Sequence, residues 1–299
     1  MSLSQNDMGR AFEYGVALGL SERLPASLED NPKLRNSKLC FERCSRREQE
    51  NIVKASREAA AFLAAHDTRL SDTGCSIYLQ SDQMGREGDV RDVIVRNSSL
   101  NEEIGISAKH RHWAVKHSRL SEQIDFGFDW FGIHSSAEYF HTVTPIFREL
   151  RTRQRRRQFW HDIPDKAQLY YLPILQAFHT ELDRLFQSNN VQVARGLIQY
   201  LLGRHDFYKV IKENSEVSIM SFNIDGSLRW GSHLPLPTRI IEISMKPSSS
   251  NTLIVTFDQG WQISFRIHNA SSRVEPSLKF DINIVGSPLL GSRHVIEYG

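Results

Sequence analysis

The chain has 299 residues, of which 40% are hydrophobic and 24% charged, and its 37 lysines and arginines against 35 acidic residues give a net charge of +2. This composition excludes a disordered chain and a mini-protein that depends on disulfide bonds. No apolar run approaches the roughly 20 residues of a membrane span, and three cysteines (Cys40, Cys44 and Cys75) cannot all pair within one chain. We therefore expect a globular, cytoplasmic protein with reduced thiols and no membrane contact.

Helical spacing of apolar residues dominates the first two thirds of the chain. Asn6 or Asp7 is expected to cap a first helix that buries Phe12, and a second helix is expected at residues 46–65. Three short strands follow in the prediction, at residues 76–79, 90–95 and 104–109. Helical patterns then resume at residues 113–123, 145–159, 169–186 and 191–202.

The hydrophobic period changes to two after about residue 214. Alternating segments occupy residues 217–223, 238–246, 251–258, 261–268 and 278–285, which predicts an antiparallel sheet. The expected fold class is therefore α/β in the broad sense (α+β). It has a core with helical insertions at residues 1–214 and a β-rich region at residues 215–299.

Two charged residues stand at the ends of adjacent predicted strands. Asp92 precedes the apolar run at residues 93–95, and Lys109 ends a segment in which Ile104, Ile106 and Ala108 share one face. If the two strands pair as a hairpin, Asp92 and Lys109 meet on the polar face. Phosphodiester hydrolysis requires at least a carboxylate that holds a divalent metal and a neighbouring lysine that orients or deprotonates a water molecule.

A second carboxylate is available on the first predicted helix. Glu13 follows Phe12, which is expected in the core, and a side chain there can reach the edge of the sheet. Each residue also has an ordinary explanation. Glu13 suits an exposed helix glutamate paired with Arg10, Asp92 a turn residue, and Lys109 a lysine at the solvent boundary. The order helix Glu, strand Asp, strand Lys is more specific than any member alone.

This order resembles the PD-(D/E)XK nuclease core, and longer segments resemble the HaeIII-type type II restriction endonuclease family. The segments that carry the resemblance are residues 6–14, 106–121 and 265–281. The resemblance implies a restriction-endonuclease-like fold and Mg²⁺-dependent cleavage of double-stranded DNA at the palindrome GGCC with blunt ends. It also implies a metal-binding role for Asp92, a catalytic role for Lys109 and the helix-acid role for Glu13. A homodimer and a partner DNA methyltransferase are further expectations of this class.

The sequence departs from the general pattern at two positions. Arg91 stands in place of the proline, and Ser107 stands where the second acid of (Asp/Glu)-X-Lys belongs. Because a serine hydroxyl is a poor Mg²⁺ ligand, the number of metal ions stays open. Glu103, Asp89 or Glu13 can supply the missing charge, and Glu13 is favoured.

The basic run after Lys109 is a candidate for DNA contact. It is expected to form a helix whose basic side chains meet phosphates or base edges, or alternatively face solvent. The candidates are Arg111, Lys116, His117 and Arg119.

Other functions compete with the restriction endonuclease. Zinc binding is a competing function, suggested by Cys40, Cys44 and the histidines at 110, 112 and 117. The spacing of these residues fits no standard zinc finger. Another nuclease of the same core, for repair, junction resolution or modified DNA, is the second alternative. A catalytically silent DNA-binding module is the third, and Ser107 is its only motivation.

Overall fold

A computed structural model describes the chain apart from residues 1–2, 82, 84–88, 99, 112–115 and 289–292. The chain divides into two compact units that alternate along the sequence. The first unit comprises Met1–Trp113, Leu202–Pro235 and Leu289–Gly299, and the second comprises Ala114–Leu201 and Leu236–Pro288. The boundaries of these units differ from the single boundary expected at residue 214, because Leu202–Pro235 belongs to the same unit as the N-terminal segment.

The first unit includes the helices α1 (Gln5–Arg23), α2 (Pro32–Glu42) and α3 (Arg46–His66), and the short turn η1 (Thr68–Ser71) follows α3. The expected cap of α1 was wrong. Ser4 caps α1, and Asp7 completes a capping box by accepting from the Ser4 backbone. Helix α3 confirms the expected second helix to within one residue. Helix α2 is an additional element, which Asn31 caps.

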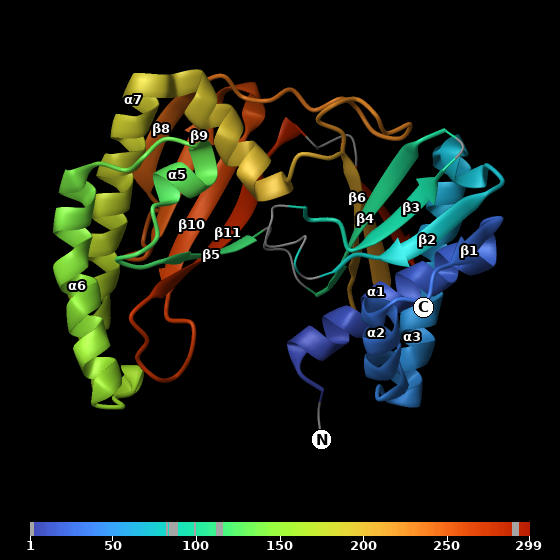
Figure 1. Ribbon diagram of the computed structural model, residues 1–299, viewed down its shortest axis with the longest axis horizontal. Helices are drawn as coiled ribbons and strands as arrows, with labels where there is room; N and C mark the ends of the chain where they lie inside the picture. Colours follow the sequence, from blue (N-terminus) through green and yellow to red (C-terminus); the bar gives the residue numbers. More distant parts are fainter. Residues whose placement is uncertain (1–2, 82, 84–88, 99, 112–115, 289–292) are drawn as a thin grey trace. The chain divides into compact units, whose positions relative to one another are not determined.

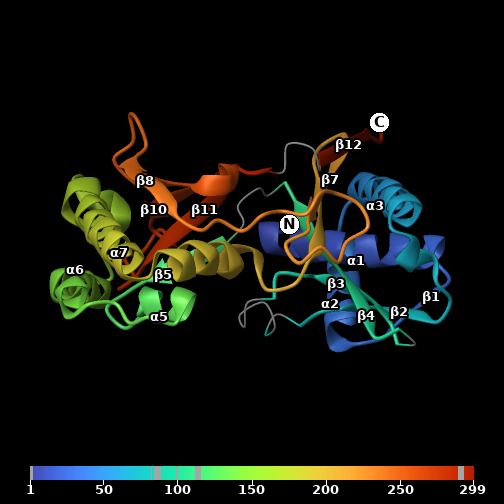
Figure 2. The ribbon, with the colours of Figure 1, turned by 90° about the horizontal axis from the view of Figure 1, so that it is seen from above.

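The first unit also contains a mixed sheet of seven strands, in the order β1-β2-β3-β4-β6-β7-β12. Figure 1 labels β1 to β4 and β6, and Figure 2 labels β7 and β12. Only β1/β2 and β4/β6 run parallel among the pairs of this sheet in the described chain. The strands are β1 (Ala26–Leu28), β2 (Cys75–Leu79), β3 (Val93–Asn97), β4 (Glu102–His110), β6 (Phe207–Lys212), β7 (Glu216–Phe222) and β12 (Arg293–Glu297). The three expected strands are confirmed as β2, β3 and β4. Strand β7 was expected in the C-terminal sheet but pairs with β6 and β12 instead.

Helix α1 packs closely against α3 and lies over β1 to β4. Two glycines on α1 permit this approach. A Cβ atom at Gly15 would lie 2.3 Å from the Ile52 side chain, and one at Gly19 would lie 2.8 Å from the backbone oxygen of Ser56. The second contact is the stricter one, because the backbone of α3 cannot rotate away as a side chain can.

We expect Gly19→Ala to destabilise the protein by about 1–3 kcal/mol, because the added methyl group pushes α1 away from α3. Gly9 lies on the same helix and has nothing within 4 Å of a built Cβ atom. Gly9→Ala is therefore the matched control, and it should be neutral or stabilising by up to about 1 kcal/mol through helix propensity. Denaturant unfolding of both variants measures the difference. Equal stability of the two would contradict the close packing.

The second unit places helices on one face of an antiparallel sheet of five strands, in the order β5-β11-β10-β9-β8 (Figure 2). The helical elements are α5 (Phe126–Phe131), α6 (Ala137–Arg155), η2 (Trp160–Asp162), η3 (Ala167–Tyr171) and α7 (Leu172–Leu202). The strands are β5 (Lys116–Leu120), β8 (Ile240–Met245), β9 (Thr252–Phe257), β10 (Gln262–His268) and β11 (Leu278–Gly286), with the turn η4 (Asp258–Gly260) after β9. Phe178 of α7 contacts Phe265 and Phe280 of the sheet.

The helix expected at residues 113–123 was wrong. Residues 112–115 lie outside the described part of the chain, and Lys116–Leu120 forms β5, which pairs with β11. Burial alternates along β5, as expected for a strand: Ser118 and Leu120 are buried, and Arg119 between them is exposed. The expected C-terminal antiparallel pairing is confirmed for β8, β9, β10 and β11. None of the described helices combines the length and the hydropathy of a membrane span.

Candidate active site

Asp92 and Lys109 meet at one end of the β3–β4 hairpin. The strands pair antiparallel with Val93 opposite Ile106, and the backbone N–H of Asp92 also donates to the Ile106 oxygen, at 2.9 Å. Lys109 Nζ donates to Asp92 Oδ2 at 2.8 Å. The expected approach of these two side chains is therefore confirmed.

Ser107, at the position expected for an acid, supports Asp92 directly. Its hydroxyl donates to Asp92 Oδ2 at 3.1 Å, and the backbone N–H of Ala108 donates to the same oxygen at 2.8 Å. Ser107 is 2% exposed. Its hydroxyl therefore orients the carboxylate of Asp92, together with the Ala108 amide and Lys109.

Glu13 is a buried residue of α1, not an exposed helix glutamate. Its Oε2 atom forms an ion pair with Lys33 Nζ at 3.1 Å. Burial, the largest influence, and the charge of Asp92 raise the pKa of Glu13 to about 7, although Lys33 and Lys109 act in the opposite direction. The two carboxyl groups of Glu13 and Asp92 are thus close enough to repel each other.

Lys109 is held in its charged form. Burial favours the neutral amine, but the charge of Asp92, the hydrogen bond to it and the charge of Glu13 outweigh burial and raise the pKa of Lys109. An ammonium with a raised pKa is a poor general base. The geometry therefore suits orientation of a reactant and stabilisation of negative charge.

Sequence analysis missed Lys209, which lies beside this group on β6. Strand β6 runs parallel to β4 with Lys209 in register with Ser107, so both side chains leave the same face of the sheet. Burial and the charge of Lys109 lower the pKa of Lys209 to about 8, and Asp92 opposes them. The alternation of residues 207–212 was the available signal, since Tyr208 and Val210 belong to the core beneath the helices.

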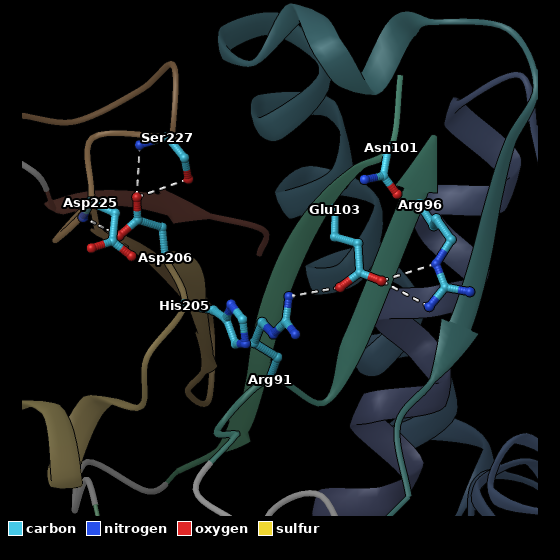
Figure 3. Close-up of a pocket in the computed structure, with 8 residues that line it drawn as sticks. All are labelled: Arg91, Arg96, Asn101, Glu103, His205, Asp206, Asp225 and Ser227. Carbon is cyan, nitrogen blue, oxygen red and sulfur yellow. Dashed lines mark hydrogen bonds and ion pairs between the residues drawn. The ribbon is translucent and has the colours of Figure 1, made fainter. Parts of the chain in front are cut away.

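Asp89 and Glu103, two candidates for the missing acid, form ion pairs with arginines. Asp89 receives a buried two-pronged contact from Arg91, with N–O distances of 2.8 and 2.7 Å. Glu103 pairs with Arg91 at 3.2 Å and with Arg96 at 2.8 Å (Figure 3). Burial disfavours the charge on Glu103, but the hydrogen bond from Arg96 and the charges of both arginines lower its pKa.

Glu103, Arg91 and Arg96 belong to a polar cavity of about 390 Å³ in the first unit. Figure 3 shows that its other wall comes from the segment around β6 and the loop that follows β7. The remaining lining residues are Asn101, His205, Asp206, Asp225 and Ser227. Asp92, Glu13 and Lys109 are not part of this lining, so the predicted site residues fall into two separate clusters.

The candidates for DNA contact belong to both units. Arg111 is exposed after β4, with its backbone N–H donating to the Lys212 oxygen at 2.9 Å. Arg119 lies in the second unit and pairs with Glu275 at 2.9 Å. Lys116 and His117 are residues of β5 whose side chains lie outside the described part of the structure. DNA contact by these four residues stays a prediction.

The zinc alternative finds no support among the described residues. Cys40, Cys44 and Cys75 are buried free thiols. In the described part of the chain, no group of three or more histidine, cysteine, aspartate or glutamate side chains is arranged to hold a metal ion. His112 lies outside the described residues.

Comparison with known proteins identifies the family of this chain. The family model for the HaeIII restriction endonuclease matches residues 9–288. The chain is also 37% identical over 306 aligned positions to "Type II restriction enzyme HaeIII" of Haemophilus aegyptius, and the alignment covers 96% of each chain. The match includes the helix that carries Glu13 and the hairpin that carries Asp92 and Lys109. The chain belongs to the HaeIII restriction endonuclease family.

Proposed function

We propose that this protein cuts both strands of DNA at GGCC, leaves blunt ends and requires Mg²⁺, with a PD-(D/E)XK-like site made of Asp92, Lys109 and Glu13. The observation that carries the proposal is the 2.8 Å contact between Lys109 and Asp92, beside the buried acid Glu13. The 37% identity to a type II restriction enzyme supports the reaction class. The sequence GGCC and the blunt ends rest on the family resemblance.

Asp92 and Glu13 fit a divalent cation. The negative charge of Asp92 repels a negative charge on Glu13 and contributes, after burial, to the raised Glu13 pKa of about 7. A cation held by both carboxylates would relieve this repulsion. Mg²⁺ in proteins is commonly held by one or two carboxylates together with water and substrate phosphates. When bound, the metal supplies Lewis-acid stabilisation of the phosphate and a more acidic water. Asp89 is not in the proposed set, because Arg91 occupies its carboxylate.

Lys109 acts as an orienting and charge-stabilising group in this proposal. Its ammonium is held by Asp92 and keeps its proton, so it can donate a hydrogen bond to the attacking water or to a phosphate oxygen. The water oxygen forms a bond to phosphorus, and the bond from phosphorus to the 3′ oxygen breaks. The 3′ oxygen leaves as a hydroxyl, and the other product carries a 5′ phosphate.

Cleavage of a palindrome on both strands suits a symmetric homodimer, in which each subunit cuts one strand. A restriction enzyme also requires that the host's own sites be protected, so the proposal includes a partner DNA methyltransferase. The β-rich region at residues 215–299 and the basic residues Arg111, Lys116, His117 and Arg119 are the proposed sources of DNA contact.

Digestion of an unmethylated plasmid of known sequence tests the proposal. With Mg²⁺ we expect discrete fragments whose ends map to GGCC, and with EDTA in place of Mg²⁺ we expect no cleavage. The same plasmid methylated at GGCC is the control and should stay intact. Random fragments would instead favour a general nuclease, and retarded but uncut DNA would favour a silent binding module.

A further inference from the structure

Exposed arginines gather at the C-terminal end of helix α6, in the second unit. Residues 151–157 include five arginines, and the last three of them are exposed. The loop that follows β10 lies beside this end of the helix (Figure 1) and adds another exposed arginine, since Phe159 and Arg273 form an antiparallel bridge. We call the following residues the arginine patch: Arg155, Arg156, Arg157 and Arg273.

Acidic side chains pair with the neighbouring arginines of α6 but not with the patch. Arg151 forms an ion pair with Glu122, and Arg153 forms one with Glu149 at 2.8 Å. Among the residues that the structure describes, no acid forms an ion pair with an arginine of the patch. Four guanidinium groups, which keep their charge at every physiological pH, therefore lie close together along the chain and its paired loop. Such a surface attracts a polyanion.

Arg157 and Arg273 also line a cavity of about 400 Å³. Glu275 is the acid of this lining, and its carboxylate accepts from Arg119 at 2.9 Å, so its charge is partly compensated. The two guanidinium groups suit the oxygens of a phosphate, to which arginine donates two parallel hydrogen bonds. The remaining lining residues are Gln154, Ser271, Ser272 and Val274.

The backbone of Arg157 favours glycine and not arginine. The N–H of Gln158 donates to the Arg153 oxygen at 3.2 Å. The N–H of Arg157 donates to the Gln154 oxygen at 2.8 Å, which completes a Schellman motif. Arg157 has the left-handed conformation in this motif, with a φ of 56°, and a Cβ atom makes that conformation unfavourable. The end of the helix therefore gains no stability from the arginine backbone, which indicates a use for its side chain.

Resting on the function proposed above, we propose that the arginine patch binds backbone phosphates of double-stranded DNA, with one phosphate seated in the cavity that Arg157 and Arg273 line. DNA is favoured over an acidic protein surface because its phosphates follow one another at short, regular intervals, so one duplex meets several guanidinium groups at once. The patch supplies affinity for DNA of any sequence and takes no part in the chemical step.

DNA affinity measured in EDTA tests the patch without cleavage. For the double variant Arg157→Gly/Arg273→Gln we expect the dissociation constant to rise about tenfold, equally for a GGCC duplex and for a duplex without that site, because phosphate contacts carry no sequence information. The slope of log affinity against log salt concentration should become shallower by about 0.9, the value of one phosphate contact. Arg157→Gly alone should unfold at the same temperature as the wild type or above it, so that a loss of affinity is not a loss of fold.

Arg35→Gln/Arg46→Gln is the matched control, because it removes the same charge from another surface. Both arginines are exposed residues of the first unit, and their acid partners are Asp30 at 2.9 Å and Glu50 at 3.2 Å. This double variant should keep the affinity and the salt slope of the wild type. An unchanged slope in the patch variant would overturn the proposal. An equal loss in both double variants would also overturn it, since the effect would then follow the net charge alone.

Modification of arginines by phenylglyoxal locates the contact. Arg157 and Arg273 should react in the free protein and be protected by a duplex, as mass spectrometry of the peptides measures, whereas Arg35 should react equally in both states. Reaction of the patch that DNA does not change would refute the assignment. If the patch variant keeps its DNA affinity but changes the particle mass in light scattering, the patch binds a second copy of the chain and the proposal is wrong.

Single-turnover cleavage separates this proposal from the proposed function. With Mg²⁺ and saturating enzyme, the patch variant should cut a GGCC duplex at the wild-type rate, and the enzyme concentration at half the maximal rate should rise about tenfold. If the wild-type protein neither binds nor cuts DNA, the proposed function fails. If the wild type binds and cuts DNA while the patch variant binds equally well, only the role of the arginine patch fails.

Discussion

Asp92→Asn and Lys109→Met are each expected to reduce the rate of DNA cleavage on the order of 10³-fold, the scale at which preorganised charges in an active site act. The asparagine keeps the shape of Asp92 and its contact with the Ala108 amide, but it removes the negative charge that holds the Lys109 ammonium and that is proposed to bind the metal ion. The methionine keeps the length of Lys109 without its charge. Single-turnover cleavage of a GGCC duplex with Mg²⁺ measures both losses.

Asp89→Asn is the matched control for Asp92→Asn. Asp89 is a neighbouring buried carboxylate whose oxygens are held by Arg91. Its substitution should weaken that ion pair and lower the thermal stability, while the cleavage rate of the folded protein stays within about tenfold of the wild type. Asp92→Asn should not lower the stability to the same degree, because it relieves the repulsion with Glu13. Loss of cleavage in Asp89→Asn alone would reverse the assignment of the two acids.

The pairing of Asp92 with Lys109 could be predicted from the sequence, because the two residues are close together along the chain. Asp92 and Lys109 are 17 residues apart, and the alternation of residues 104–109 fixes which side chains share a face with Lys109. A short antiparallel hairpin then brings the two residues together without reference to any other part of the chain. Glu13 was expected from its place on the helix beside Phe12, and its burial agrees with that expectation.

The position of Lys209 beside Asp92, and the division into two units whose segments alternate along the chain, could not be predicted in the same way. Strand β6 pairs with β4 although the segment Ala114–Leu201 of the second unit lies between them in the sequence. A two-fold pattern identifies a strand but does not name its partner, so nothing in residues 207–212 pointed to Ser107. The basic run at residues 116–120 was read as a helix because its charged residues hid the alternation of Ser118 and Leu120. Pairing with β11 decided its conformation.

The largest loss of stability is expected for Lys212→Met, which breaks a charged cluster behind the active-site strand. Lys212 is fully buried, and its Nζ donates to Glu48 Oε1 at 2.9 Å; His110 Nε2 lies 3.2 Å from the same oxygen. Without Lys212, the partly buried carboxylate of Glu48 loses its main partner. We expect a loss of about 2–4 kcal/mol, somewhat below a fully buried pair because Glu48 retains contact with water.

The loss caused by Lys212→Met should shrink as the pH falls. Burial, then the charge of Lys212, lowers the pKa of His110. Burial acts to raise the pKa of Glu48, but the hydrogen bond and charge of Lys212, together with the contact with His110, outweigh burial and lower that pKa. Both groups bind protons more readily in the unfolded chain. Their contribution to stability is therefore complete above the unfolded pKa of His110, about 6.5, and is lost progressively on acidification. Removal of Lys212 raises both folded pKa values and weakens this dependence.

Thermal unfolding at pH 8 and at pH 5 measures the effect. The difference between the wild type and Lys212→Met should be larger at pH 8, and the exposed-lysine control Lys246→Met should match the wild type at both values. Adding Glu48→Gln to Lys212→Met should recover part of the stability, because the double variant no longer leaves a charge without its partner. A difference independent of pH, or no recovery in the double variant, would mean that Lys212 stabilises β6 through packing of its stem and not through its charge.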